Sequence, residues 1–279
     1  MKLGQIKQHL THVTHQLGAS VKLGPREYRM RGYFENRMAH DFFHEPFLTT
    51  VLKRSLSQRA GTFVDIGVNV GQTLIKVLAL DPQRPYVGFE PQIGCCFFID
   101  QFIRDNALNH MQVIPVALSN KNRLCPLFSN SPFDEMASIS GKIELTGRER
   151  QHQEWVSARP GDEVIEEIGL KSIALIKIDV EGAELQVIQG LTRTLAIERP
   201  IVIFEVLPNY VGHERTMLDV ETSRANSLTA DQLYNLLRDA GYRISQIDGQ
   251  GEESAIERFN LDDKVNYVGS NFIAHPIPS

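Results

Sequence analysis

Three acidic residues of this 279-residue chain follow apolar, β-branched segments and have the chemistry of acid–base catalysts. Asp179 and Glu181 come directly after one such segment, and Glu205 ends another. A carboxylate within hydrogen-bond reach of a hydroxyl group can take its proton in the transition state. We therefore predict Asp179, Glu181 and Glu205 as catalytic residues, with Asp179 as the base. Glu181 would bind the acceptor or hold Asp179 in place, and Lys177 is predicted to be structural.

A second set of residues is typical of a turn that binds a nucleoside. The segment 62–66 carries Asp65 and is followed by Gly67 and Gly71, and Glu90 ends the next apolar segment. In an open α/β sheet these positions lie at the carboxyl ends of neighbouring strands, beside the ligand crevice. Glycine lets the backbone adopt positive φ and approach a ligand closely, and Glu90 can accept both hydroxyl groups of a ribose. The alternative is a turn that only joins a strand to a helix.

The residues missing from this turn indicate which nucleoside it binds. The dinucleotide fingerprint G-x-G-x-x-G has Asn69 and Gln72 at its second and third glycine positions here, and the carboxylate of Asp65 would repel a pyrophosphate. S-adenosylmethionine has a ribose, no phosphate and a cationic amino-acid tail, so we predict it as the cofactor. Its predicted binding residues are Asp65, Gly67, Asn69, Gly71, Thr73, Glu90, Pro91 and Ala117.

Two motifs resemble those of a known family. The segment Ile176-Lys177-Ile178-Asp179-Val180-Glu181-Gly182-Ala183-Glu184 matches the family hallmark IKIDVEG-E, and residues 65–71 match D-x-G-x-N-x-G. Further matches are Glu90-Pro91 and residues 116–119, 203–205 and 271–274. The chain therefore resembles the FkbM family of S-adenosylmethionine-dependent methyltransferases over about residues 45–275. It departs from the family at an LDD-like segment, of which only Asp162 is present.

The resemblance implies an α/β protein with a class I methyltransferase Rossmann-like fold. Its sheet is expected to be mostly parallel and seven-stranded, with an antiparallel last strand. Alternating strands and helical windows support this expectation. The predicted strands are 62–66, 85–90, 111–117, 173–179, 200–205, 242–247 and 270–274. A capping-box spacing of Thr229 and Gln232 predicts a helix that ends at Gly241.

The N-terminal part of the chain is predicted to be helical. Residues 1–59 are expected to form an N-terminal helical segment, and residues 60–279 the methyltransferase domain. Leucines and other apolar residues between Leu3 and Leu17 recur at spacings of three and four, which predicts a helix that ends at Gly18. After a linker at 24–26, a second helical segment is predicted to run to about residue 59. The apolar stripe packs on its own domain or forms the seam of a homodimer.

Composition excludes several partners. The net charge of −5 argues against binding to a phosphate backbone, so we expect no nucleic acid. No apolar run has the length of a membrane span and no signal-peptide block is present, so we expect a cytoplasmic protein. The three cysteines have no C-x-x-C spacing, which fits reduced, buried thiols.

Two polar stretches, 129–162 and 208–227, interrupt the strand pattern and are predicted to wall an acceptor pocket. They contain Trp155, Tyr210 and His213, which we predict as acceptor contacts. The alternative for Trp155 is a core or lid residue.

The resemblance implies O-methyl transfer to a hydroxyl group, most often of a sugar in a glycan or a glycosylated metabolite. A polyketide or peptide acceptor is the alternative, and a non-catalytic protein that binds an adenosine ligand is a third hypothesis. Asp179 and Glu205 end adjacent predicted strands, where a magnesium ion could bind. No further oxygen ligand adjoins Glu205, so we expect no metal.

Overall fold

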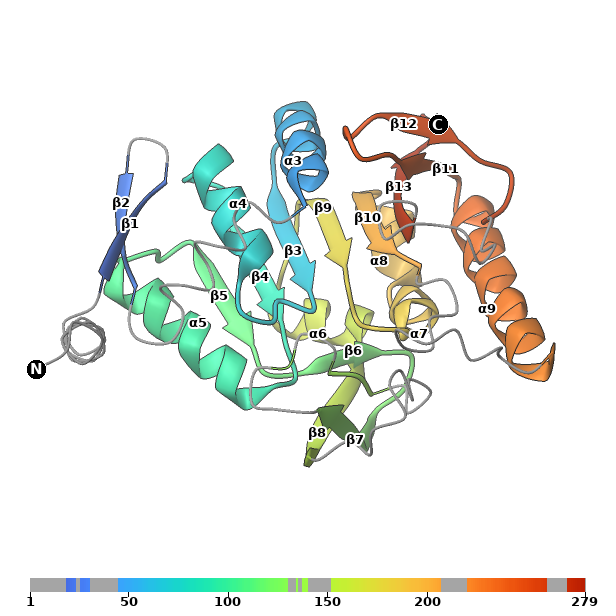
Figure 1. Ribbon diagram of the computed structural model, residues 1–279, viewed down its shortest axis with the longest axis horizontal. Coiled ribbons are helices and arrows are strands. Elements are labelled where there is room, and N and C mark those ends of the chain that lie inside the picture. Colours follow the sequence, from blue (N-terminus) through green and yellow to red (C-terminus); the bar gives the residue numbers. More distant parts are fainter. Residues whose placement is uncertain are drawn as a thin grey trace, which may run out of the picture.

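A central sheet organises the protein, which we describe from a computed structural model for residues 19–23, 26–30, 45–129, 134, 137–139, 152–206, 220–259 and 270–278. In the part described, its eight strands have the order β12-β11-β13-β10-β9-β3-β4-β5 (Figure 1). They are β3 (Thr62–Ile66), β4 (Tyr86–Phe89), β5 (Met111–Ile114), β9 (Ile173–Ile178), β10 (Ile201–Glu205), β11 (Tyr242–Ile247), β12 (Glu253–Ala255) and β13 (Asn271–Pro276).

Strand directions follow the prediction of a mostly parallel sheet. Five adjacent strands run parallel to one another: β5, β4, β3, β9 and β10. Strand β13 lies between β10 and β11 and is antiparallel to both. The antiparallel last strand is therefore confirmed. The short strand β12 pairs antiparallel with β11 and adds an eighth strand to the seven expected.

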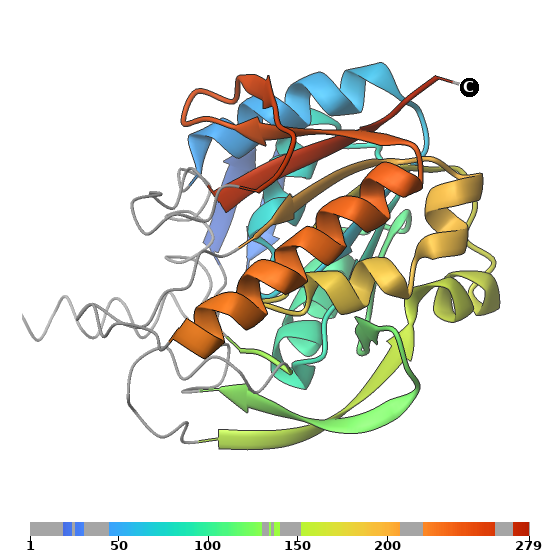
Figure 2. The ribbon, with the colours of Figure 1, turned by 90° about the vertical axis from the view of Figure 1, so that its right-hand side faces the viewer.

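Helices cover both faces of the sheet because successive strand residues point to opposite sides. One face packs against α3 (Pro46–Gln58), α4 (Gln72–Leu80) and α5 (Ile93–Asp105). The other packs against α6 (Gly161–Glu167), α7 (Glu184–Gln189), α8 (Thr192–Ile197) and α9 (Val220–Asp239), as Figure 2 shows from the side. Within β3, Phe63 belongs to the first core and Val64 to the second. Polar side chains can therefore gather only at the strand ends.

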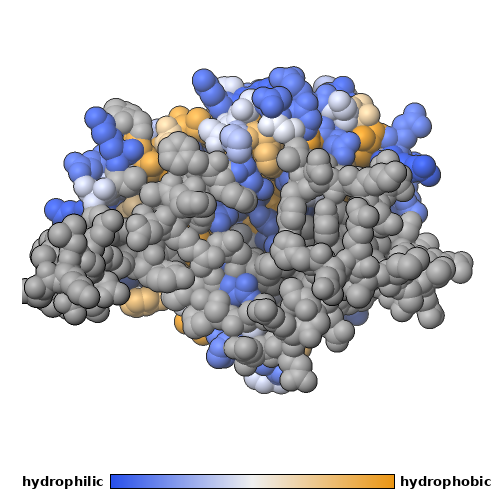
Figure 3. Space-filling view, in the orientation of Figure 1, coloured by the Kyte–Doolittle hydropathy of each residue, from blue (hydrophilic) through white to orange (hydrophobic). Residues whose placement is uncertain are grey.

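Helix α3 confirms the helical prediction for its residues. Pro46 stands at its first turn, where a missing N–H costs nothing. Leu48, Leu52 and Leu56 recur every four residues and are buried against the sheet. The opposite side of α3 lies along the upper edge of the molecule, where hydrophilic residues predominate (Figure 3).

Residues 19–30 contradict the predicted N-terminal helical segment. Strands β1 (Ala19–Leu23) and β2 (Arg26–Met30) form an antiparallel pair instead. Tyr28 and Met30 are buried while Glu27 and Arg29 are exposed, which is the alternation of a strand with one buried face. The predicted helix at 3–17, its homodimer seam and the linker residues 24 and 25 lie outside the described residues.

A small second sheet contradicts the predicted loop at 129–162. Strands β6 (Ala117–Ser119), β7 (Arg123–Ser129) and β8 (His152–Pro160) have the order β6-β8-β7. Val156 and Ala158 of β8 pack on Cys125 and Leu127 of β7, and this small core holds the sheet together. The predicted strand 111–117 is divided between β5 and β6.

Helix α9 begins earlier than predicted. It starts at Val220, so Thr229 lies inside the helix and the expected capping box is wrong. The predicted end is confirmed, since Gly241 has φ 81° and its N–H donates to the carbonyl of Arg238. The cysteines are buried and form no disulfide in the described part of the chain, as expected: Cys95, Cys96 and Cys125.

Candidate active site

A cavity of about 650 Å³ opens at the carboxyl ends of the parallel strands, a size typical of small-molecule sites. Its walls come from the segments that follow β3, β4, β5, β9 and β10 and from the start of α3. The lining residues used below are Glu45, Asn69, Thr73, Glu90, Pro91, Gln92, Ala117, Leu127, Ala137, Ile139, Lys177, Asp179, Glu181 and Glu205. Two predicted cofactor residues, Asp65 and Gly71, are absent from the lining.

Gly67 is a glycine because two loops meet at it. Its φ is 89°, and a Cβ atom there would lie 1.8 Å from the carbonyl oxygen of Asp179. The N–H of Asp179 in turn donates to the carbonyl of Ile66 at 2.9 Å. Gly67 lines the cavity, and its missing side chain also makes room for the loop after β9. Gly71, with φ 88°, is the N-cap residue of α4.

Glu90 is held rigidly at the cavity wall by backbone hydrogen bonds. The N–H of Asn69 donates to Oε2 and the N–H of Gln92 donates to Oε1, both at 2.8 Å. Burial raises the pKa of the Glu90 carboxyl to about 7, although these two bonds act to lower it. Each carboxylate oxygen retains a lone pair that can accept a hydroxyl group. Glu90 thus has the geometry predicted for a ribose ligand.

Asp65 lies behind the cavity wall, in the core. Its side chain is fully buried, and Tyr86 donates its hydroxyl to Oδ2 at 2.5 Å. Oδ1 has no hydrogen-bond partner among the described residues. Burial raises the pKa of this carboxyl to about 6, while the Lys177 ammonium acts to lower it. The structure therefore does not bring Asp65 to the cavity, contrary to the direct cofactor contact that we predicted.

Lys177 is a site residue that sequence reasoning missed. Its Nζ lies 2.7 Å from Oδ2 of Asp179, and it is paired in register with Asp65 across β3 and β9. Burial acts to lower the pKa of this ammonium, but the carboxylates of Asp179 and Asp65 raise it overall, so Lys177 is charged. We had predicted Lys177 to be structural. Positions i and i+2 of a strand share one face, and this spacing was the available signal.

The catalytic acids that we predicted do meet at the cavity. Asp179, Glu181 and Glu205 all line it, and Ser270 donates its hydroxyl to Oε1 of Glu205 at 2.6 Å. Burial raises the pKa of the Glu181 and Glu205 carboxyls, and the neighbouring charge of Asp179 raises both further.

The charge of the cavity is strongly unbalanced. Five carboxylates line it, from Glu45, Glu90, Asp179, Glu181 and Glu205, and Lys177 is the one basic residue among the lining residues described. A ligand with positive charge would favour the ionised form of these carboxyls and would be bound by it. Among the described residues, no group of three or more His, Cys, Asp or Glu side chains is arranged to hold a metal ion.

The segment after β7 forms part of the wall, as predicted for the stretch 129–162. The carbonyl of Asp134 accepts hydrogen bonds from Asn69 Nδ2 and Gln92 Nε2, both at 3.0 Å. Ala137 and Ile139 line the cavity beside Leu127.

Of the predicted acceptor contacts, Trp155 lies among the described residues, whereas Tyr210 and His213 lie outside them. Trp155 is on β8 and is not among the residues that line the described cavity. It is 66% exposed, so it is not a core residue.

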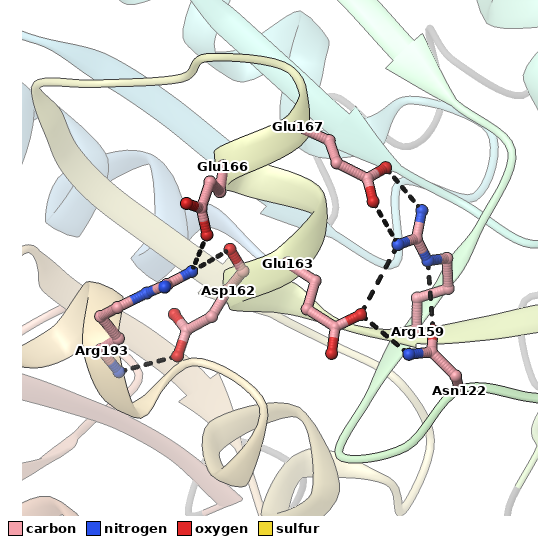
Figure 4. Close-up of polar contacts among 7 residues, drawn as sticks. All are labelled: Asn122, Arg159, Asp162, Glu163, Glu166, Glu167 and Arg193. Carbon is pink, nitrogen blue, oxygen red and sulfur yellow. Dashed lines mark hydrogen bonds and ion pairs between the residues drawn. The ribbon is translucent and has the colours of Figure 1, made fainter.

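Asp162 is the residue that the chain shares with the LDD-like segment of the family, and it has a structural role (Figure 4). Its carboxylate accepts the backbone N–H groups of Arg193 and Thr194, both at 2.8 Å, and so caps the start of α8. Arg193 also donates to Glu166 at 2.6 Å. These contacts fasten α6 to α8 and do not involve the cavity lining.

A Rossmann-like sheet with a cavity at the carboxyl ends of its parallel strands is the arrangement of proteins that bind nucleotide-like cofactors. Residues 65–244 match the methyltransferase FkbM domain. The chain belongs to the FkbM methyltransferase family.

Individual relatives match this chain only in part or at low sequence identity. The 2-O-methyltransferase NoeI of Sinorhizobium fredii (strain NBRC 101917 / NGR234) is 32% identical over 148 residues, which are 49% of this chain and 59% of NoeI. The match thus spans less than two thirds of that relative. Methyltransferase FkbM from Methylobacillus flagellatus KT is 15% identical, with a TM-score of 0.45 over 77% of this chain and 43% of its own. A putative caffeoyl-CoA O-methyltransferase from Staphylococcus aureus is 10% identical, with a TM-score of 0.47 over 98% of this chain and 97% of its own.

The helices give no sign of a membrane span. In the portion of the chain that the structure describes, none of them combines the length and the apolar character needed to cross a bilayer.

Proposed function

We propose that the protein is an S-adenosylmethionine-dependent O-methyltransferase that acts on a hydroxyl group of a sugar, in a glycan or a glycosylated metabolite. The observation that carries this proposal is the cavity at the strand ends, with the rigid Glu90 in its wall and carboxylates around Lys177. Membership of the FkbM methyltransferase family supports it, as does the similarity to the 2-O-methyltransferase NoeI.

The residues present fit the cofactor. Glu90 offers two carboxylate oxygens, each with a free lone pair, to the ribose hydroxyl groups. Pro91, Ala117 and Leu127 offer apolar surface to the adenine. The acids Asp179, Glu181 and Glu205 offer negative charge to the ammonium and sulfonium groups. When bound, the cofactor supplies a methyl group that its sulfonium already activates, so the protein's main task is alignment.

The charge of the cavity also restricts the acceptor. In their ionised forms, the four carboxyls besides Glu90 would repel an acceptor with a phosphate or carboxylate group near the reacting hydroxyl. A neutral, hydroxyl-rich acceptor meets no such repulsion and finds many hydrogen-bond acceptors. This favours an uncharged sugar over a sugar phosphate or a uronic acid.

The experiment that tests the proposal offers methyl-labelled S-adenosylmethionine together with a panel of acceptors. The panel contains neutral free sugars, neutral oligosaccharides, sugar phosphates, uronic acids and macrolide aglycones. We expect label to reach a neutral sugar and to be found as an O-methyl ether. Label on an aglycone alone would show a natural-product methyltransferase. Label on none, with tight binding of S-adenosylhomocysteine, would favour a non-catalytic binder.

A further inference from the structure

The carboxylates of Asp179, Glu181 and Glu205 differ in how many of their oxygen atoms already accept a hydrogen bond or form an ion pair. Oδ2 of Asp179 is in an ion pair with Lys177 at 2.7 Å. Oε1 of Glu205 accepts the hydroxyl of Ser270 at 2.6 Å. The carboxylate of Glu181 lines the cavity and has no hydrogen bond or ion pair to any residue that the structure describes. Of the three acids Asp179, Glu181 and Glu205, Glu181 is therefore the one with both oxygens available to a ligand.

The backbone holds Glu181 in an unusual conformation. Its φ is 51°, in the left-handed region that residues other than glycine rarely adopt. Ser138, in the segment after β7, donates its hydroxyl to the carbonyl of Glu181 at 2.7 Å. On the C-terminal side of Glu181, the N–H of Gly182 donates to Glu184 Oε1 at 3.1 Å. A strained conformation maintained from both sides is characteristic of functional positions.

We propose that Glu181 is the catalytic base and that Lys177 and Asp179 form a positioning pair beside it. This inference rests on the proposed function. As the acceptor oxygen forms its bond to the methyl carbon, the O–H proton moves to a Glu181 carboxylate oxygen. The bond between that carbon and sulfur breaks, and its electron pair remains on sulfur, which gives neutral S-adenosylhomocysteine. Lys177 cannot act as the base because its ammonium is protonated.

The charges around Glu181 make its carboxylate suited to this task. Burial raises the pKa of the Glu181 carboxyl, and the charges of Asp179, Glu205 and Glu184 raise it further, whereas Lys177 acts to lower it. With a pKa of about 9, the carboxylate is a stronger base than an ordinary glutamate but is mostly protonated at neutral pH. Only the ionised form accepts a proton, so the rate should rise with pH until Glu181 is fully ionised.

Single-turnover rates measured against pH test the proposal, with wild type, Glu181→Gln and Asp179→Asn compared. Glu181→Gln should lower the rate about 100- to 10,000-fold and remove the rising limb of the pH profile. Because S-adenosylhomocysteine has no sulfonium charge and Asp179 and Glu205 remain for its ammonium group, its affinity should change little. Asp179→Asn should keep the limb and move it to lower pH, because the charge of Asp179 raises the pKa of Glu181.

Two further variants make the result decisive. Glu181→Asp retains a carboxylate and should retain a rising limb, which keeps the test valid if Glu181→Gln does not fold. Glu257→Gln is the matched control, since it makes the same chemical change at an exposed position, and its profile should equal that of wild type.

The opposite pattern would overturn the inference. If Glu181→Gln kept the rising limb while Asp179→Asn lost it, Asp179 would be the base. Failure of the wild type to bind S-adenosylhomocysteine would refute the proposed function itself, and this binding measurement separates the two failures.

Discussion

Replacing Glu90 by glutamine should remove the loss of stability that Glu90 causes at alkaline pH while it weakens cofactor binding. In the folded protein the pKa of the Glu90 carboxyl is about 7, against an ordinary value of 4.5. Between these values the folded protein binds more protons than the unfolded chain, so the free energy of unfolding falls as pH rises. At 1.36 kcal/mol per pKa unit, the full loss is about 3 kcal/mol. A glutamine at this position is neutral throughout and avoids that loss.

The assay is urea unfolding of wild type and Glu90→Gln at pH 5 and pH 8. At pH 5 the variant should be the less stable protein, because glutamine has one accepting oxygen for the two backbone N–H groups that Glu90 accepts. Between pH 5 and pH 8 the wild type should lose about 2–3 kcal/mol that the variant retains. The pKa values of Asp65 and Glu184 are raised by burial too, to about 6 and about 7. Their contributions occur in both proteins and cancel in the difference.

Cofactor binding should weaken in the variant. A hydrogen bond to a charged group contributes about 1.5–3 kcal/mol, and glutamine retains only one accepting oxygen. The affinity for S-adenosylhomocysteine at pH 8 should therefore fall about tenfold or more, as measured by calorimetry. Equal pH dependence of stability in the two proteins would refute the reasoning, since Glu90 would then be ionised without cost. Unchanged affinity would remove Glu90 from the cofactor site.

Three further substitutions test individual contacts. Gly67→Ala places a Cβ 1.8 Å from the Asp179 carbonyl oxygen and should cost about 1–3 kcal/mol or more in urea unfolding; full stability would contradict the loop contact. Asp162→Ala removes the cap of α8 and should cost about 0.5–2 kcal/mol without changing S-adenosylhomocysteine affinity, which calorimetry checks. Trp155→Ala should leave stability within about 0.5 kcal/mol and KM for the acceptor unchanged; a raised KM would place Trp155 in the acceptor site.

The buried strands were the most predictable part of the fold. Strands β3 and β9 are covered on both faces, so their segments are apolar apart from Thr62, Asp65 and Lys177, and their predicted limits agree with the structure within a residue. Strand β8 was missed because it buries little beyond Val156 and Ala158 and is otherwise polar. Its partner strands β6 and β7 also lie more than 20 residues earlier in the chain. A local sequence pattern does not show which distant segments pair.

The candidate site was predictable in its acids but not in their partners. Glu90, Asp179, Glu181 and Glu205 were found because each follows an apolar segment. The burial of Asp65 depends on Tyr86, and the need for glycine at position 67 depends on the loop after β9. Both contacts join segments that only the sheet order brings together.

A crystal structure with S-adenosylhomocysteine tests the central claim most directly. The account predicts the ligand in the 650 Å³ cavity, with its ribose hydroxyl groups within hydrogen-bond distance of Glu90 and its sulfur on the side of Glu181. A ligand bound elsewhere, or a ribose that does not contact Glu90, would contradict it.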